Sequence, residues 1–186
     1  MKVAGRAGLY SLVAWPPHEL ARWVAEVQRD LGLAAFGAPH LNLRAPFEYA
    51  GDEGVLLDAS ARVALDLPAF EVRFRAWRRF PHTVFLELAA VEALREAHAR
   101  SLRELPVAPS ERDGDGYLPH LTLALGVCPW AEGDVWARVK ELVPPVLSWT
   151  VDAFALTLEQ RGEIVELARF GLAQPAVATQ EESASR

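Results

Sequence analysis

Two segments of the sequence repeat the same residue types in the same order. Residues 39–43 read Pro-His-Leu-Asn-Leu and residues 119–123 read Pro-His-Leu-Thr-Leu, so the two histidines stand 80 positions apart (120 − 40). Proline cannot continue a helix, and the alternation of apolar and polar residues that follows it is typical of a half-buried β-strand. Each segment therefore predicts a strand that presents a histidine and, two residues later, a hydrogen-bonding side chain on one face.

A pair of histidines that meet across a groove is suited to in-line displacement at phosphorus. His40 and His120 are the candidate catalytic residues, because one imidazole can take a proton from the attacking oxygen while the other gives a proton to the leaving oxygen. Asn42 and Thr122 are uncharged donors that can bind the non-bridging phosphate oxygens. The two motifs together predict one shared active site.

Two alternatives stay open at this point. A single histidine at the start of an edge strand is more often a structural residue that bonds a backbone carbonyl, although this reading does not explain the repeated polar partner. Both histidines could instead hold a metal ion, but such a site needs a third carboxylate, histidine or cysteine ligand, and neither motif supplies one. We therefore expect no metal and no other cofactor.

The hydrophobic pattern predicts an α+β fold that is duplicated. It predicts strands near residues 8–15, 70–77, 83–88, 147–158 and 163–172, and helices near 18–31, 53–66, 90–105 and 131–143. Residues 18–89 and 90–172 then each read helix, motif strand, helix, strand, strand. We expect a single bilobal domain over residues 1–173, in which each lobe is a small, mostly antiparallel sheet with helices outside, and the motif strands face a groove between the lobes. Residues 174–186 predict a disordered tail.

Composition limits the classes of function. The 186 residues are 51% hydrophobic, which is enough for one compact core, and the net charge of −6 gives no global field for long duplex nucleic acid. The single cysteine, Cys128, excludes an intramolecular disulfide. The apolar run near the N-terminus is short and meets two prolines, so it predicts a first strand and no signal peptide, and no stretch is long enough to span a membrane. We expect a cytoplasmic protein.

Several other residues are candidates for substrate contact. Arg44 lies beyond Asn42 on the predicted motif face, where it could grip a phosphate or form a surface ion pair. Phe47 and Tyr117 flank the two motifs and could stack on a base, although such aromatics more often belong to the core or its rim. Four arginines within residues 71–79 could follow a nucleotide backbone, but a solvated strand face is favoured; they are Arg73, Arg75, Arg78 and Arg79. For His82 and His98 we favour structural roles.

At residues 39–47 and 117–125 the sequence resembles the two-histidine phosphoesterases, the family that includes the 2'-5' RNA ligases and cyclic phosphodiesterases. That family carries one His-x-Thr/Ser-x motif in each lobe of a duplicated α+β fold. By position, His40 and Asn42 match the first motif, and His120 and Thr122 match the second. Asn42 departs from the usual hydroxyl residue. The order of the predicted elements extends the resemblance over nearly all of residues 7–172.

The resemblance implies metal-independent hydrolysis of a cyclic phosphodiester, either an RNA 2',3'-cyclic phosphate end or a small cyclic nucleotide. In some members this activity is accompanied by reversible 2'-5' ligation. The expected partner is a nucleotide or an RNA end, with no membrane and no long duplex, and we expect a monomer. The alternative is a non-catalytic RNA-end or nucleotide-binding module that keeps the groove without turnover.

Overall fold

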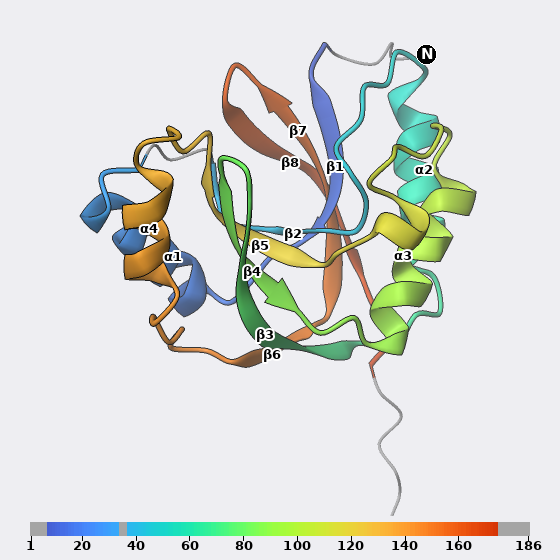
Figure 1. Cartoon of the computed structure of the whole chain (residues 1–186). Helices are drawn as coiled ribbons and strands as arrows, with labels where there is room; N and C mark the ends of the chain where they lie inside the picture. Colours follow the sequence, from blue (N-terminus) through green and yellow to red (C-terminus); the bar gives the residue numbers. More distant parts are fainter. Residues whose placement is uncertain (1–6, 34–36, 175–186) are drawn as a thin grey trace, which may run out of the picture.

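The computed structural model describes residues 7–33 and 37–174 (Figure 1). Over these residues the strands are β1 (Leu9–Ala14), β2 (Leu41–Asn42), β3 (Phe70–Phe80), β4 (Thr83–Leu88), β5 (His120–Leu125), β6 (Ser148–Val151), β7 (Ala153–Gln160) and β8 (Glu163–Gly171). The α-helices are α1 (His18–Asp30), α2 (Glu53–Ala64), α3 (Glu92–Glu104) and α4 (Glu132–Val139), and a 3-10 turn covers Gly114–Gly116. Most of the predicted tail lies outside the described residues.

The strands form one continuous sheet in the order β6-β3-β4-β5-β2-β1-β7-β8, and all pairs of neighbouring strands are antiparallel. The short β2–β5 pair lies in the middle, with three further strands on each side of it. The prediction of a mixed fold with a mostly antiparallel sheet is therefore confirmed. The two-lobed division and the bounds of the two pseudo-repeats stay predictions.

The predicted strand near 147–158 is two strands, and this part of the prediction is wrong. The chain leaves the strand conformation at Asp152, so that β6 pairs with β3 while β7 pairs with β1. These partners belong to opposite halves of the sheet. The apolar pattern runs almost without interruption through the break, because both strands contribute buried residues such as Trp149 and Phe154 to the same core.

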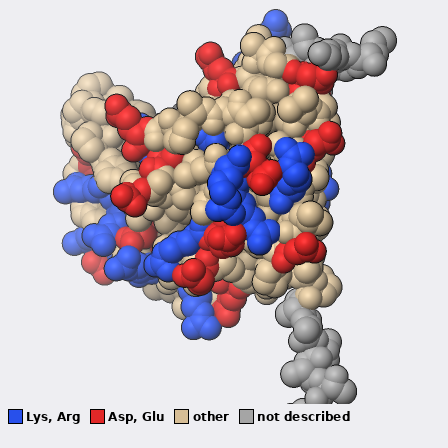
Figure 2. Space-filling model, turned by 90° about the vertical axis from the view of Figure 1, so that its right-hand side faces the viewer, with Lys and Arg blue, Asp and Glu red and all other residues tan. Residues whose placement is uncertain are grey.

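The helices are arranged in two pairs. In Figure 1, α1 and α4 lie together at one side of the sheet, and α2 and α3 lie together at the other. Arg and Glu side chains link α2 to α3 and join neighbouring turns of α3, as in the Arg62–Glu104 and Arg100–Glu96 ion pairs. Figure 2 shows this side of the molecule, where basic and acidic residues are interleaved. Exposed pairs of this kind contribute about 0–1 kcal/mol each, so the helix positions depend mainly on apolar packing.

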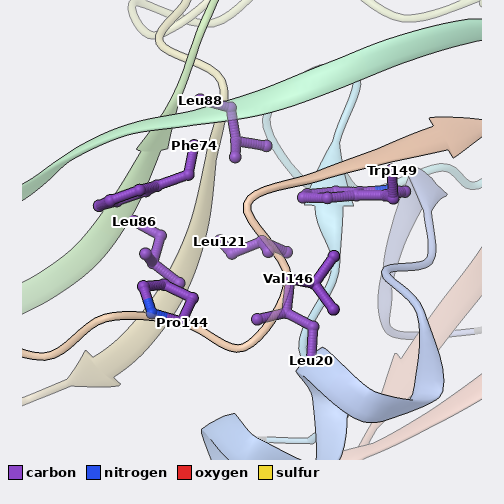
Figure 3. A pocket seen from close by; sticks show the side chains of 8 residues that line it. All are labelled: Leu20, Phe74, Leu86, Leu88, Leu121, Pro144, Val146 and Trp149. Atoms are coloured by element: carbon purple, nitrogen blue, oxygen red, sulfur yellow. The ribbon is translucent and has the colours of Figure 1, made fainter.

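The core fills the face of the sheet opposite to the polar motif residues. Leu41 and Leu121, the middle residues of the two motifs, are fully buried. Around Leu121, Leu20 of α1 meets side chains of β3, β4 and β6, and together they leave no space large enough for a water molecule (Figure 3). Close packing on this face fixes the register of both motif strands, because a shift by one residue would move each leucine to the opposite face of the sheet.

The alternation of β5 changes within the strand. Leu121 and Leu123 are buried as predicted, but Leu125 is 60% exposed and Ala124 is buried. The pairing of β4 with β5 shifts between Val84 and Phe85, where Leu123 is the extra residue. A bulge adds one residue to a strand and reverses its pattern beyond that point. Regular alternation along this strand predicts that Leu125 faces the core, and the bulge makes that prediction wrong, whereas the histidine end of β5 keeps the predicted pattern.

Candidate active site

The register of β2 and β5 brings the two motifs together. Leu41 pairs with Leu121 in an antiparallel ladder, so Asn42 stands opposite His120, and His40 stands opposite Thr122 when the register is extended by one residue. Directly opposite side chains have Cβ atoms about 4.5–5.5 Å apart, and diagonal ones about 7–8 Å. The two histidines are diagonal neighbours on one face of the sheet, which we call the motif face. All four side chains are partly exposed.

A hydrogen bond from Nδ1 to a nearby backbone carbonyl holds both histidines in the same tautomer. His40 Nδ1 lies 2.8 Å from the Ala38 carbonyl oxygen, and His120 Nδ1 lies 2.7 Å from the Leu118 carbonyl oxygen. A carbonyl only accepts, so each Nδ1 carries the proton, and each neutral ring has its lone pair on Nε2. In both motifs the carbonyl belongs to the residue before proline, a position that is biased to extended backbone. The Pro-His sequence thereby orients the ring.

Burial lowers the pKa of His40 below its ordinary value, while the bond to the Ala38 carbonyl and the negative charge of Glu159 act in the opposite direction. The ring of Trp15 meets the His40 ring edge-on at a centroid distance of 6.1 Å. The indole Nε1 of Trp15 donates to Glu166 at 2.7 Å. His40 is therefore packed against an aromatic ring and lies within the field of one carboxylate, that of Glu159.

Burial also lowers the pKa of His120, against the effect of the bond to the Leu118 carbonyl. The positive charges of His40 and Arg112 lower the pKa further. The ring of Phe85 packs on His120 at a centroid distance of 5.0 Å. Because both pKa values are lowered, both rings are mainly neutral at pH 7, and each Nε2 is then available to accept a proton.

The backbone of Asn42 is fixed by a hydrogen bond, whereas one polar atom of its side chain has no hydrogen-bond partner among the described residues. Its carbonyl oxygen accepts a 3.0 Å hydrogen bond from the Tyr117 hydroxyl, whereas its buried Oδ1 has no hydrogen-bond partner among the described residues. The amide can turn to exchange its oxygen and nitrogen, so this position can present a donor to an incoming oxygen. An unpaired buried amide is costly, and a bound ligand would relieve that cost.

Arg44 does not lie on the motif face, and the expectation of a phosphate contact there is corrected. Its side chain is 1% exposed and donates to the Val107 and Ala108 carbonyls and to Asp113. Burial lowers the pKa of Arg44, and the Asp113 carboxylate opposes this shift. Asp113 also accepts from the backbone of Ala45. The loop that carries Asp113 is thus anchored behind the first motif.

Tyr117 and Phe47 are also engaged within the protein. The Tyr117 ring stacks on His98 at 3.9 Å and 5°, and His98 bonds the Leu43 carbonyl through Nδ1 and accepts from Gly114 through Nε2. Phe47 is 9% exposed in the core and stacks on Tyr10. Phe47 therefore has no exposed face for base stacking, and that expectation is corrected, whereas Tyr117 is half-buried and its contact with a base stays a prediction. The structural role expected for His98 agrees with its bonds.

Sequence reasoning missed three features beside the histidines. Trp15 ends the first predicted strand and Arg112 lies in a polar segment, so the residue pattern gives no reason to place either one at the site. Glu87 pairs directly with His120 across β4 and β5, and it is buried although it carries a carboxylate. A charged residue within an otherwise apolar strand, Thr-Val-Phe-Leu-Glu-Leu, was the available signal for Glu87.

In the part of the chain that the structure describes, no group of three His, Cys, Asp or Glu side chains could hold a metal ion. A hollow of about 450 Å³ opens between β3 and α4, but neither histidine lines it. The site is therefore assigned from the register, the tautomers and the side-chain chemistry of the motif face. Across residues 7–33 and 37–174, no helix is both long and apolar enough to cross a membrane.

Comparison with known proteins supports this assignment of fold. In structure, the chain is similar to E. coli LigT complexed with 3'-AMP (TM-score 0.61, 17% identity, covering 90% of this chain and 98% of LigT). It is also similar to LigT complexed with NADP+ (TM-score 0.61, 18% identity, 90% and 99%) and to a protein described as a phosphoesterase (TM-score 0.60, 18% identity, 91% and 100%). No curated protein matches the sequence. The model of the 2'-5' RNA ligase superfamily matches residues 16–163, and the chain belongs to this superfamily of two-histidine phosphoesterases.

Proposed function

We propose that this protein hydrolyses a cyclic phosphodiester, either an RNA 2',3'-cyclic phosphate end or a small cyclic nucleotide, with His40 and His120 as the catalytic residues. The observation that carries the proposal is the diagonal placement of two histidines in the same tautomer on neighbouring strands. Each Nδ1 is occupied by a backbone carbonyl, which leaves the two Nε2 atoms for proton transfer. Asn42 and Thr122 stand opposite these rings as uncharged partners for phosphate oxygens.

In the proposed reaction the oxygen of water forms a bond to phosphorus, and the bond from phosphorus to one ribose oxygen breaks. One neutral histidine accepts the proton of the attacking water at Nε2, and the other, protonated, gives its Nε2 proton to the leaving oxygen. The product is a phosphomonoester on the ribose. If the 5'-hydroxyl of a second RNA replaces water as the nucleophile, the same displacement gives a 2'-5' bond, which would be the ligase activity.

Two further facts support a nucleotide substrate. The chain belongs to a superfamily named for RNA ligation, and LigT, which has the same fold, has been determined with 3'-AMP and with NADP+. The fold alone does not define a substrate. We infer the substrate class from the site itself, where two proton-transfer groups and two neutral hydrogen-bonding groups are clustered. A monomer in the cytoplasm is part of the same proposal.

The test is incubation with a 2',3'-cyclic mononucleotide and with a short RNA that ends in a 2',3'-cyclic phosphate. EDTA is included so that contaminating metal-dependent phosphatases do not contribute. We expect a phosphomonoester product, detected by chromatography, that is lost in His40→Ala and in His120→Ala. His82→Ala is the matched control, because His82 bonds Val127 and Glu132 away from the motifs. Product formation that survives in either motif variant would contradict the proposal.

One observation favours the alternative of a binding module without turnover. Asn42 replaces the hydroxyl residue of the family motif, and its buried Oδ1 has no partner among the described residues. An amide oxygen facing an anionic phosphate would repel it, unless the amide turns. Saturable binding of the cyclic nucleotide with no product over many hours would establish this alternative, and product formation would exclude it.

A further inference from the structure

A β-bulge places two arginines on the motif face beside His120. Arg75 and Arg78 are three residues apart on β3 and would point to opposite faces of a regular strand. The pairing of β3 with β4 shifts between Phe74 and Ala76, so Arg75 is an extra residue and joins Arg78 on the same face. Both guanidinium groups bind one carboxylate, with Arg75 Nη1 at 2.7 Å and Arg78 Nε at 2.6 Å from Glu87.

Glu87 holds this pair next to the catalytic centre. It is the cross-strand partner of His120, and its side chain is 3% exposed, whereas the side chains of Arg75 and Arg78 are 63% and 56% exposed. The carboxylate neutralises one of the two positive charges and restrains both side chains. A guanidinium has five N–H donors, and the bonds to Glu87 occupy only some of them. The arginine pair therefore presents positive charge and free donors to solvent.

The position of the arginine pair is suited to a second anionic group of the substrate. Neighbouring strands are about 4.8 Å apart, so β3 lies about 10 Å from β5, and a long side chain covers part of that distance. Arg112, whose charge reaches His120, adds to the positive charge on this side of the site. On the other side, the negative charge of Glu159 acts on His40. A second phosphate would therefore be attracted to the His120 side.

We propose that Arg75 and Arg78 bind a second phosphate of the substrate, the one on the 5' oxygen of the nucleotide whose cyclic phosphate lies at His40 and His120. This proposal rests on the proposed function and narrows its substrate class. The substrate is an oligonucleotide end, in which that phosphate is internucleotide, and a cyclic nucleoside phosphate alone leaves the arginine pair empty. Guanidinium forks bind phosphate oxygens bidentately, which is the chemistry that the pair offers.

The test compares kcat/KM for three substrates: a 2',3'-cyclic mononucleotide, the same nucleotide with a 5'-monophosphate, and a dinucleotide with a 2',3'-cyclic end. We expect the dinucleotide to exceed the unphosphorylated mononucleotide by about 10–100-fold, the range that charge-assisted hydrogen bonds of about 1.5–3 kcal/mol provide. In the Arg75→Ala/Arg78→Ala double variant this ratio should fall close to one. The 5'-monophosphate arm shows whether a terminal phosphate is bound as well as an internucleotide phosphate.

Arg79→Ala is the matched control. It removes one positive charge from the same strand, but Arg79 lies over the ring of Trp136, 5.1 Å from its centroid, and follows Arg78 on the alternate face. This variant should keep the substrate ratio of the wild type. A general loss of folding in the double variant would lower all rates together and leave the ratio unchanged, so the ratio separates substrate binding from a structural role.

Three results would overturn the proposal: equal kcat/KM for the three wild-type substrates, an unchanged ratio in the double variant, or the same change in Arg79→Ala. If the wild type hydrolyses none of the substrates, the proposed function fails, and the arginine pair is tested by equilibrium binding. A dinucleotide with a 3'-phosphate should then bind at least about tenfold more tightly than the 3'-mononucleotide, and only when the arginine pair is present. Equal binding of these two ligands would reject the phosphate site.

Discussion

The same kind of backbone hydrogen bond orients both histidines, but the charges around the two rings differ. In both motifs a carbonyl two residues before the ring holds Nδ1, at 2.8 Å for His40 and 2.7 Å for His120. The charge of Glu159 favours a proton on His40, whereas the charges of Arg112 and of His40 itself disfavour one on His120. The repeated sequence sets the orientation of the rings, and strands and loops outside the motifs set their acidity.

This difference predicts the roles of the two rings. Burial lowers both pKa values, and the Glu159 carboxylate opposes this shift at His40. The carboxylate opposite His120, that of Glu87, is already paired with two arginines, so the pKa of His40 should lie above that of His120. When two titratable groups are pushed apart in this way, the one with the higher pKa is the better acid in its protonated state and the other is the better base. We expect His40 to be the general acid and His120 the general base.

The largest expected effect is loss of turnover in His40→Ala and His120→Ala. Each should slow kcat by roughly two to four decades, about 3–5 kcal/mol of barrier, because each removes one proton-transfer step. Both rings are partly exposed on the motif face, so we expect the fold to survive, as thermal melts will show. In His120→Ala the acidic limb of the pH–rate profile should disappear, and in His40→Ala the alkaline limb.

The two pH profiles test the assignment of acid and base separately from the size of the rate loss. If His40→Ala loses the acidic limb instead, the roles are reversed, and Glu159 does not decide them. If either variant keeps a rate near that of the wild type, the two rings do not share one site.

The next largest effect is expected at Asn42, which stands opposite His120. If the amide donates to a phosphate oxygen mainly in the transition state, Asn42→Ala should lower kcat by about tenfold to a few hundredfold, or about 1.5–3 kcal/mol. Asn42→Thr restores the hydroxyl of the second motif and should keep most of the activity. Steady-state kinetics and melting temperatures for both variants test this prediction. A loss of stability with unchanged kcat per folded molecule would assign Asn42 a structural role.

The local pattern was sufficient to predict the motif strands and most of the helices. Alternation around His40 and His120 placed the polar residues on one face because Leu41 and Leu121 must be buried. The diagonal register could not be predicted, since it depends on which strands become neighbours in the sheet. The two β-bulges also depend on how neighbouring strands pair, and pairing is not visible in the sequence. The sequence therefore could not predict that Leu125 is exposed or that Arg75 lies on the motif face.

Arg44 shows why site membership is harder to predict than the fold. Strand alternation placed it with His40 and Asn42, but β2 ends at Asn42, and the chain turns before Arg44. The buried carboxylate of Asp113, 69 positions further along, then pairs with the guanidinium at 3.3 Å. Such a long-range pair leaves no local signal in the sequence. Alternation applies only while the strand continues.

A smaller effect is expected from Tyr117→Phe, which removes one hydrogen bond and keeps the ring on His98. The hydroxyl holds the Asn42 carbonyl at 3.0 Å, and a single bond of this kind contributes about 0.5–1.5 kcal/mol. The melting temperature should fall by a few degrees, roughly as expected for about 1 kcal/mol in a domain of this size. KM should be nearly unchanged. A large rise in KM with unchanged stability would instead show that the Tyr117 hydroxyl contacts the substrate.

The lowered pKa values also predict a modest pH dependence of stability. Between pH 6.5, the reference value of histidine, and the lower folded values, the unfolded chain binds more protons than the folded protein at His40 and His120. Stability from these groups is therefore complete above pH 6.5 and is lost as the pH falls through that window. Denaturant unfolding at several pH values should show a shallower decline for His40→Gln/His120→Gln than for the wild type. An unchanged slope would mean that neither pKa is lowered.

The smallest expected effect is the electrostatic coupling between the two rings. It is also the most direct test of whether the charges around His40 and His120 set their different pKa values. The positive charge of His40 lowers the pKa of His120, so replacing His40 by the neutral Gln should raise the pKa of His120. Glu159→Gln removes the charge that favours a proton on His40 and should lower the pKa of His40. NMR titration of the ring protons measures both changes in the folded protein. If the pKa of His120 is unmoved in His40→Gln, the rings lie too far apart to act on one phosphate, whatever the rates show.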